Sequence, residues 1–255
     1  MTTARPTTAE QKQLWEDSFD EQIARGAYNT APVEALIRST AYWLRDRKTA
    51  ATGAQSEPLS FLEMGCGAGP TLVWLAQKGI RVSGVDIASN ALELAKANLA
   101  RQGYADRIGQ LVESSVTKTP FADASFDGII ESCVFQHLPL ADRNAAFAEV
   151  ARLLKPGGLF VGHVLADAHT TFQQKKNDQL ADDPGSLLLQ DGSSKIHLTN
   201  IGLAHFFSEH EFAKLLPGFS VVDPCLTTYY LPKSEATKRG YDRYLQAMWT
   251  VVAIK

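Results

Sequence analysis

The sequence lacks the features that mark secreted, membrane-spanning and nucleic-acid-binding proteins. Its first residues, MTTARPTTAE, contain no apolar core of the kind found in signal peptides. No uninterrupted apolar run approaches the roughly 18 residues that a membrane span needs. The 25 Lys and Arg residues are outnumbered by 28 Asp and Glu, and the net charge of −3 creates no field that attracts a phosphate backbone. We therefore expect a cytoplasmic protein that binds neither nucleic acid nor a membrane.

Cysteine is also scarce, and its distribution argues against two kinds of site. The three cysteines, Cys66, Cys133 and Cys225, are far apart and form no C-x-x-C pair. This spacing does not fit a disulfide framework or a zinc site built from thiolates. The histidines show no metal-ligating spacing such as H-x-x-x-H either. We expect small buried thiols and no metal site.

The sequence does contain enough apolar material for a sizeable core. It has 255 residues, and 45% of them are hydrophobic. Two amphipathic helical patterns, joined by residues 26–32, precede a polar stretch of small residues over 49–57. We predict a helical cap and linker over residues 1–57 and a larger domain over 58–255.

Short apolar strands alternate with helical patterns in the first half of the larger domain. Such alternation predicts an α/β fold with a parallel sheet. The predicted strands cover residues 59–63, 81–86, 108–113, 126–131 and 159–165, and the predicted helices cover 70–77, 89–101 and 141–154.

The alternation stops after residue 165. Residues 166–200 are polar and irregular, and they are too many for an ordinary connection, so we predict a lid-like insertion there. A helix is predicted over 208–216. Strands are predicted over 219–228 and 246–254 without a helix between them, and we expect these strands to end the sheet as an antiparallel hairpin.

A glycine-rich loop between a strand and a helix is the most informative segment. It reads Glu63-Met-Gly65-Cys-Gly67-Ala-Gly69. Alternate glycines let the backbone approach a ligand, because no Cβ blocks contact and positive φ costs little. The dinucleotide fingerprint G-x-G-x-x-G is not met, since Pro70 stands at its third glycine position. The Gly-Lys-Ser/Thr ending of a Walker A loop is missing too.

An acidic residue complements this loop. Asp86 ends the second predicted strand, 23 residues (86 − 63) after Glu63. A carboxylate at the carboxyl end of that strand can accept hydrogen bonds from both hydroxyls of a ribose. The loop and the acid together predict a ligand that contains a nucleoside.

In these and further motifs the sequence resembles the class I S-adenosylmethionine-dependent methyltransferase family. The family's first motif is an acidic residue followed by G-x-G-x-G, and VDIA at 85–88 resembles its ribose-binding motif. Three more matches follow in order: TPFADASFD at 119–127, QHL at 136–138 and LLKPGG at 153–158. The resemblance covers about residues 59–165. It implies a Rossmann-like, seven-stranded, mostly parallel sheet of order 3-2-1-4-5-7-6, with strand 7 antiparallel and helices on both faces.

The resemblance also implies how S-adenosylmethionine is held, with S-adenosylhomocysteine as the product. The three loop glycines would pass beneath the methionine portion, and Glu63 would order the loop and reach the ammonium of the cofactor through water. Asp86 would hold the ribose, and Ile87 would press on the adenine face.

Two positions depart from the family's pattern. Ser115, which precedes Val116 in the segment near the adenine, stands where many relatives carry Asp, and a neutral hydroxyl accepts a hydrogen bond more weakly than a carboxylate. Glu131 stands where relatives offer a backbone carbonyl to the ammonium of the cofactor. We expect its side chain to face the substrate or to add charge near that ammonium.

Candidate catalytic residues are few, because in-line methyl transfer from a sulfonium does not strictly require a base. His137 follows the fourth strand and is a candidate for a base or a substrate-positioning residue, or else a loop histidine bonded to backbone. His163 is a second candidate, whose direction depends on strand register. Tyr28 lies in the turn between the two N-terminal helices. It either attracts the sulfonium through its ring or packs the turn.

Four other aromatic residues are assigned from their spacing. Trp15 and Phe19 lie at helical spacing on one apolar face, so we expect them in the core of the cap rather than on the cofactor. Tyr229 and Tyr230 are neighbours on a predicted strand. Only one of them can face a pocket.

We therefore expect an enzyme that transfers a methyl group from S-adenosylmethionine to an O or N atom of a small-molecule acceptor, such as a secondary metabolite. A protein- or RNA-directed methyltransferase is an alternative, although the sequence shows no basic surface for RNA. A module that binds S-adenosylmethionine without catalysis is another. No motif identifies the acceptor or the oligomeric state.

Overall fold

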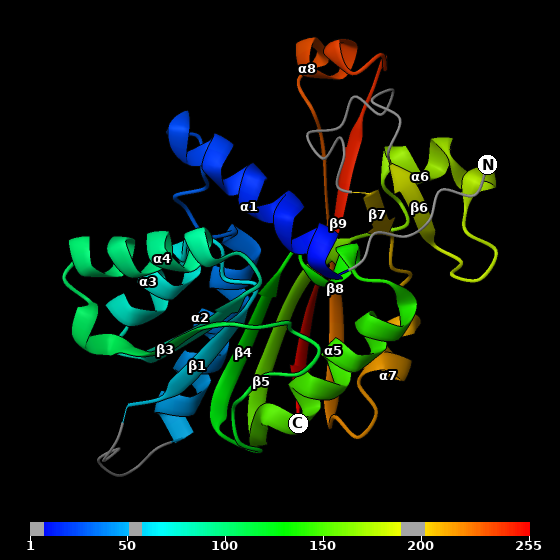
Figure 1. The fold of residues 1–255 in the computed structure, drawn as a ribbon. Coiled ribbons are helices and arrows are strands. Elements are labelled where there is room, and N and C mark those ends of the chain that lie inside the picture. The colour runs from blue at the N-terminus through cyan, green and yellow to red at the C-terminus, as the bar shows by residue number, and fades with distance from the viewer. Residues whose placement is uncertain (1–7, 51–57, 190–201) are drawn as a thin grey trace.

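A seven-stranded sheet forms the centre of the computed structural model, which describes residues 8–50, 58–189 and 202–255 (Figure 1). Its strands are Ser60–Met64 (β1), Arg81–Asp86 (β2), Ile108–Glu113 (β3), Phe126–Ser132 (β4), Leu154–Leu165 (β5), Val221–Tyr230 (β8) and Leu245–Ile254 (β9). The strand order is β3-β2-β1-β4-β5-β9-β8. Strands β1 to β5 are parallel, and β9 runs antiparallel to both of its neighbours. The predicted fold class, strand order and antiparallel last strand are confirmed.

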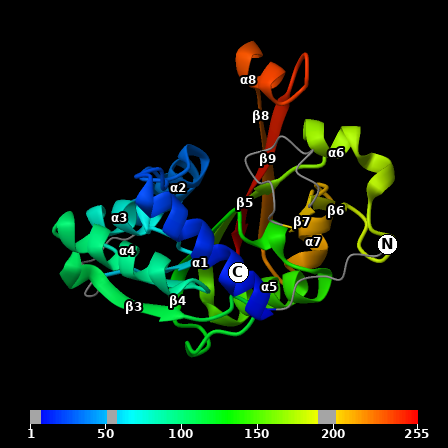
Figure 2. The same ribbon diagram turned by 45° about the horizontal axis from the view of Figure 1, so that its top comes forward.

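Helices cover both faces of this sheet (Figures 1 and 2). The helices are Thr8–Ala24 (α1), Glu34–Ala50 (α2), Pro70–Gln77 (α3), Ser89–Arg101 (α4), Leu140–Leu153 (α5), Thr170–Gln174 (α6), Glu211–Leu215 (α7) and Lys233–Lys238 (α8). Apolar side chains of α2, α3 and α4 pack on one face, and those of α5 and α7 pack on the other. Within the described ranges, no helix is both long enough and apolar enough to cross a bilayer.

The central strands are apolar at successive positions because both of their faces are buried. Phe61 and Ile130 belong to the core beneath α2, α3 and α4. Their neighbours Leu62 and Ile129 belong to the core beneath α5. Parallel strands covered on both sides have this composition, and it leaves their carboxyl ends as the free edge where ligands bind in open α/β sheets.

The start of β5 and the connection between β8 and β9 differ most from the prediction. Strand β5 begins at Leu154, not at 159, because the Lys-Pro-Gly-Gly segment pairs with the end of the chain. Gly157 donates to the carbonyl of Lys255 at 2.7 Å, and Lys255 donates to the carbonyl of Gly158 at 3.1 Å. The C-terminal hairpin is present as predicted, but its connection contains the short helix α8, which the sequence did not predict.

The insertion over 166–200 is more regular than expected in the part that the structure describes. It contains α6 and a strand, Ser186–Leu189 (β6), that pairs antiparallel with Gly202–His205 (β7). A buried ion pair ties this segment to α5, since the Arg143 guanidinium lies 2.6 Å from Asp183. The hydroxyl of Ser186 donates to the same carboxylate at 2.8 Å. Residues 190–200 of the predicted lid lie outside the described residues.

Candidate functional site

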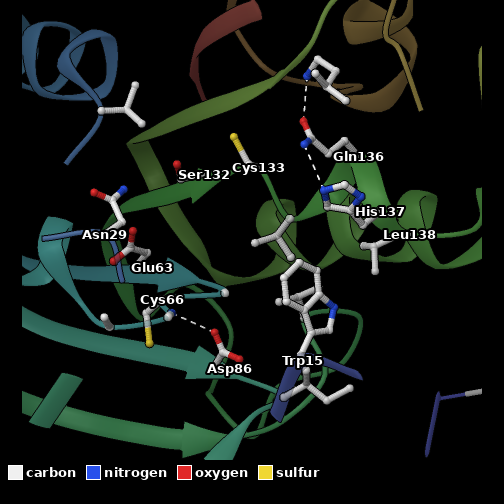
Figure 3. A pocket seen from close by; sticks show the side chains of 18 of the residues that line it. Trp15, Asn29, Glu63, Cys66, Asp86, Ser132, Cys133, Gln136, His137 and Leu138 are labelled. Atoms are coloured by element: carbon white, nitrogen blue, oxygen red, sulfur yellow. Dashed lines mark hydrogen bonds between the residues drawn. The ribbon is translucent and has the colours of Figure 1, made fainter. Parts of the chain in front are cut away.

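A cavity of about 1030 Å³ opens at the carboxyl ends of β1, β2 and β4. The glycine loop after β1, the end of β2 and the turns after β3 and β4 form part of its wall. Helix α1 and the extended end of the β8–β9 hairpin complete it. Figure 3 shows Glu63, Cys66, Asp86 and His137 around this space, with Trp15 of α1 beside His137.

The glycine loop has the backbone conformation that the sequence predicted. Gly65 and Gly67 have φ angles of 77° and 50°, in the left-handed region that favours glycine. A Cβ on Gly65 would lie 2.3 Å from Val134, and one on Gly67 would lie 3.2 Å from the ring of Phe19. The N–H groups of Gly65 and Cys66 both donate to the carbonyl of Val85, at 2.8 and 2.9 Å. These two bonds hold the loop against β2.

Gly69 is the residue before the first turn of α3 and has a φ of 75°. It is not among the residues that line the cavity. A Cβ there would lie 3.0 Å from the Cβ of Ala95 in α4. The expected part of Gly69 beneath the ligand therefore stays a prediction, and its missing side chain allows α3 and α4 to pack closely.

Asp86 is a buried carboxylate that links the loop to the end of β2. Its Oδ2 accepts a 2.8 Å hydrogen bond from the Gly67 N–H (Figure 3). Its Oδ1 accepts a 3.0 Å bond from the Ala88 N–H. Burial raises the pKa of Asp86, and these backbone donors offset part of the rise. Each oxygen keeps a second lone pair that can accept from a ligand. The next residue, Ile87, also lines the cavity.

Ser115 and Val116 line the cavity after β3. The hydroxyl of Ser115 lies 2.8 Å from that of Thr117 and accepts a 3.2 Å bond from the Thr117 N–H. Part of its hydrogen-bonding capacity is therefore used within the turn. Val116 offers an apolar surface beside it.

Two buried carboxyl groups lie behind the loops. Burial raises the pKa of Glu63 to about 8, and bonds from the Thr71 hydroxyl and the Leu72 N–H oppose that rise. Burial likewise raises the pKa of Glu131 to about 7. One oxygen of each, Oε2, has no hydrogen-bond partner among the described residues. Glu63 lines the cavity, and its unpartnered Oε2 is buried in the cavity wall.

Glu131 is not among the residues that line the cavity, so its expected part near the substrate or the ammonium stays a prediction. Its Oε1 accepts from the N–H of Val134 and from that of Phe135, the latter at 3.0 Å. Cys133, which lies between Glu131 and Val134 in the chain, has a φ of 61°, unusual for a residue other than glycine. Glu131 therefore holds the strained turn that presents Cys133, Val134 and His137 to the cavity.

His137 lines the cavity, but both of its ring nitrogens are engaged. Its Nδ1 lies 2.9 Å from the carbonyl of Leu203, which can only accept, so Nδ1 carries the proton. Its Nε2 faces the amide nitrogen of Gln136 at 3.1 Å (Figure 3). Gln136 in turn accepts from the N–H of Leu165 at 2.8 Å. Burial lowers the pKa of His137 to about 4, which makes the ring a neutral tether between the turn and β7.

Two other predicted residues lie away from the cavity. His163 is buried in the sheet, where its Nδ1 lies 2.9 Å from the hydroxyl of Thr250, and burial lowers its pKa to about 4. Tyr28 borders a separate hollow of about 120 Å³ with Val73 and Asn98, and Asn29 lines the main cavity instead. Neither His163 nor Tyr28 is among the residues that line the main cavity, so their parts in the site stay predictions.

Several lining residues were missed or assigned elsewhere. Trp15 and Phe19 line the cavity, contrary to the expectation that they form the core of the cap. Tyr229 lines it and Tyr230 does not, as strand alternation requires. Arg239 of the hairpin tip was not recognised, because its position depends on the unpredicted helix α8. Among the described residues, no three His, Cys, Asp or Glu side chains converge as a metal site.

The sheet order, the glycine loop and the acid at the end of β2 define an α/β protein of the Rossmann-like class with a nucleoside-sized site. A family model described as "Methyltransferase domain" matches residues 62–162. The methyltransferase GfsG of Streptomyces halstedii is 40% identical over 100 residues, which are 38% of this chain and 34% of that protein. The O-methyltransferase rstn1 of Aspergillus nomiae is 33% identical over 155 residues, 55% of this chain and 66% of that protein. Residues 62–162 therefore form a methyltransferase domain similar to those of the class I S-adenosylmethionine-dependent methyltransferases.

A solved structure has the same fold over the whole chain. It is the 1,6-didemethyltoxoflavin-N1-methyltransferase of Burkholderia thailandensis, with bound 1,6-didemethyltoxoflavin and S-adenosylhomocysteine. The TM-score is 0.61 at 18% identity, and the match covers 100% of this chain and 93% of that one. The first three curated relatives are matched over only 45%, 34% and 31% of their own lengths.

Proposed function

We propose that this protein binds S-adenosylmethionine in the cavity and transfers its methyl group to an O or N atom of a small-molecule acceptor. The observation that carries the proposal is the pairing of the Gly67 N–H with the Asp86 carboxylate at the edge of the 1030 Å³ cavity. This arrangement joins the positive-φ loop to the acid that would hold a ribose. The cavity is at the upper end of the size range of small-molecule sites, which fits a nucleoside together with an acceptor.

The residues present fit the cofactor. Asp86 keeps lone pairs for ribose hydroxyls after its two backbone bonds. Ile87 and Val116 provide apolar surface for an adenine, and Ser115 provides a hydroxyl at the same edge. The buried Oε2 of Glu63 lacks a partner, and a ligand ammonium would supply one. An ammonium there would also lower the raised pKa of Glu63, because an opposite charge favours the ionised carboxylate.

The protein's part in the reaction is positioning and exclusion of water. S-adenosylmethionine supplies an electrophilic methyl group on a sulfonium that leaves as a neutral thioether. The chain then has to hold the acceptor in line at attack distance, an effect that can supply much of the rate. Trp15 of α1 packs beside His137 of the turn after β4, with ring centres 5.9 Å apart. With a pKa of about 4, His137 would orient the acceptor and would not act as its base at neutral pH.

Helix α1 would close the site as a cap, and the insertion beginning at residue 166 would act as a lid. Phe19 and Trp15 of α1 cover the glycine loop and the turn after β4. Leu203, which follows the insertion in β7, is tethered to His137. The cover formed by α1 supports a small acceptor over a macromolecular one. The names of the O-methyltransferase rstn1 and of the 1,6-didemethyltoxoflavin-N1-methyltransferase support O or N as the methylated atom, whereas one relative is named as a sterol 4-C-methyltransferase.

Titration calorimetry with S-adenosylmethionine and S-adenosylhomocysteine, with NAD as a control, tests the proposal without knowledge of the acceptor. We expect micromolar binding of both sulfur nucleosides and none of NAD. Failure of both to bind would contradict the proposal. Binding without methyl transfer to any small molecule in a labelled-methyl screen would favour a non-catalytic module, and transfer to a protein or RNA would favour the macromolecular alternative.

A further inference from the structure

One wall of the cavity is not used by the residues proposed to hold the cofactor. It is the extended end of the β8–β9 hairpin, where Tyr229, Leu231, Tyr244, Gln246 and Met248 line the cavity. Tyr229 pairs with Gln246, and the Leu231 N–H donates to the Tyr244 carbonyl, so alternate residues of both strands share one face. That face is mainly aromatic and apolar. It is suited to the flat body of an acceptor rather than to a flexible polar chain.

Helix α8 adds a single cation to this wall. Arg239 lines the cavity, and its side chain is only 10% exposed. Its Nη1 donates to the carbonyl of Glu235 at 3.2 Å and lies 3.5 Å from the Glu235 carboxylate. That carboxylate makes a shorter contact, 2.6 Å, with Lys238. The guanidinium carbon lies 5.8 Å from the centre of the Tyr244 ring.

The remaining donors of Arg239 are free within the described ranges. The contacts above use Nη1, whereas Nε and Nη2 have no hydrogen-bond partner among the described residues. Neither nitrogen is among the fully buried unpartnered atoms, so an acceptor in the cavity can reach them. A guanidinium presents adjacent N–H groups in a fork that matches the two oxygens of a carboxylate.

We infer that the acceptor is an aromatic carboxylate whose carboxylate group binds Arg239. This inference rests on the proposed function, since it concerns the acceptor of that same site. Arg239 is the only Lys or Arg among the described residues that line the cavity. Carboxyl side chains are more numerous in the wall, at Glu10, Glu63, Asp86, Asp142 and Glu235. This excess of acids disfavours a doubly charged phosphate and leaves a single negative charge next to Arg239 as the better match.

Pairs of aromatic acids and their methyl esters test the inference on the full chain saturated with S-adenosylhomocysteine. The probes are hydroxybenzoates, hydroxycinnamates and heteroaromatic carboxylates, each with its ester, and the readout is the dissociation constant from calorimetry. We expect at least one acid to bind about tenfold or more tightly than its ester. Arg239→Gln should raise the dissociation constant of that acid about tenfold and leave the dissociation constant of the ester unchanged. Arg239→Lys, which keeps the charge but loses the fork, should fall between.

Arg243 provides the matched control. It is exposed on the same hairpin, and its guanidinium lies 4.1 Å from the centre of the Tyr230 ring, outside the cavity lining. Arg243→Gln removes the same charge and should leave the acid-over-ester preference unchanged. The inference is overturned if no acid binds more tightly than its ester. It is also overturned if Arg239→Gln keeps the acid-over-ester preference, or if Arg243→Gln reduces that preference as much as Arg239→Gln does. Affinity for S-adenosylhomocysteine, measured first for every variant, reports folding and tests the cofactor proposal separately.

Discussion

At the scale of single residues, Asp86 and Ser115 are expected to contribute unequally to cofactor binding. Asp86 offers a charged acceptor that also holds the Gly67 N–H, whereas Ser115 offers a neutral hydroxyl that bonds within its own turn. Asp86→Ala should weaken S-adenosylhomocysteine binding by about tenfold or more, and Ser115→Ala by only a few-fold. Asp86→Asn, which keeps one acceptor oxygen, should fall between. If calorimetry shows that Ser115→Ala loses as much affinity as Asp86→Ala, or more, the assignment of Asp86 to the ribose is contradicted.

His137 is expected to affect turnover without affecting cofactor affinity. Its ring joins the turn after β4 to Leu203, so its loss should misplace the acceptor. His137→Ala should lower the rate of methyl transfer by roughly tenfold, with an unchanged dissociation constant for S-adenosylhomocysteine. His137→Gln, whose amide can still donate to the Leu203 carbonyl, should recover part of the rate.

The pH dependence separates this tethering role from a catalytic base. Because the pKa of His137 is about 4, this residue should not titrate near pH 6.5. The pH–rate profiles of the wild type and of His137→Gln should therefore have the same shape around pH 6.5. An inflection near pH 6.5 that disappears in His137→Gln, or unchanged turnover in His137→Ala, would contradict the tethering role.

We expect the buried His163 to make the stability of the fold depend on pH. Its folded-state pKa of about 4 lies below the ordinary value of 6.5, so the unfolded chain binds a proton more readily. The free energy of unfolding should therefore fall as the pH drops from about 6.5 to about 4, by roughly 2 kcal/mol at pH 5 from this residue alone. His163→Gln should remove that part of the decrease between pH 7 and pH 5 in urea unfolding. An equal decrease in variant and wild type would show that His163 is not the cause.

At the scale of secondary-structure elements, α1 is fastened by polar contacts at the start of α4. Ala88 precedes α4 and provides no side-chain cap. Glu16 of α1 caps α4 instead. Its Oε1 accepts hydrogen bonds from the hydroxyl of Ser89 at 2.9 Å and from the N–H of Ser89 at 3.3 Å. The carbonyl of Glu16 also accepts from Asn90 at 2.9 Å. Loss of these contacts would loosen the cap over the cavity.

Glu16→Ala should raise the dissociation constant of S-adenosylhomocysteine about fivefold, because less of the protein would be in the closed form. Glu21→Ala is the control, since Glu21 lies on the exposed face of the same helix and, within the described part of the chain, its carboxylate forms an ion pair with Arg25 alone. Calorimetry at two salt concentrations should show a smaller difference between wild type and Glu16→Ala at high salt. Equal effects of the two substitutions would argue against α1 as the cover of the site.

At the scale of the whole molecule, the sheet was largely predictable from the sequence, whereas the outer half of the cavity was not. Buried parallel strands are apolar on both faces and stand between clear turn signals, so β1 to β4 were placed within a residue or two. The glycine loop and Asp86 were predictable because backbone conformation and charge there are local properties.

The remaining site residues depend on packing between distant segments. The Glu131 side chain turns back to its own loop, and Tyr28 packs near α3, neither of which is visible in residue spacing. Trp15 lines the cavity only because α1 lies across the carboxyl edge of the sheet. Arg239 reaches it only through α8, a helix too short to leave a periodic pattern.

A crystal structure of the protein with S-adenosylhomocysteine would test most directly whether this cavity is a methyl-donor site. We predict that both ribose hydroxyls donate to the carboxylate of Asp86 and that the adenine lies between Ile87 and Val116. The amino group of the ligand should lie near the unpaired oxygen of Glu63. A ligand bound elsewhere, or bound in the cavity without contact to Asp86, would contradict the assignment of the site.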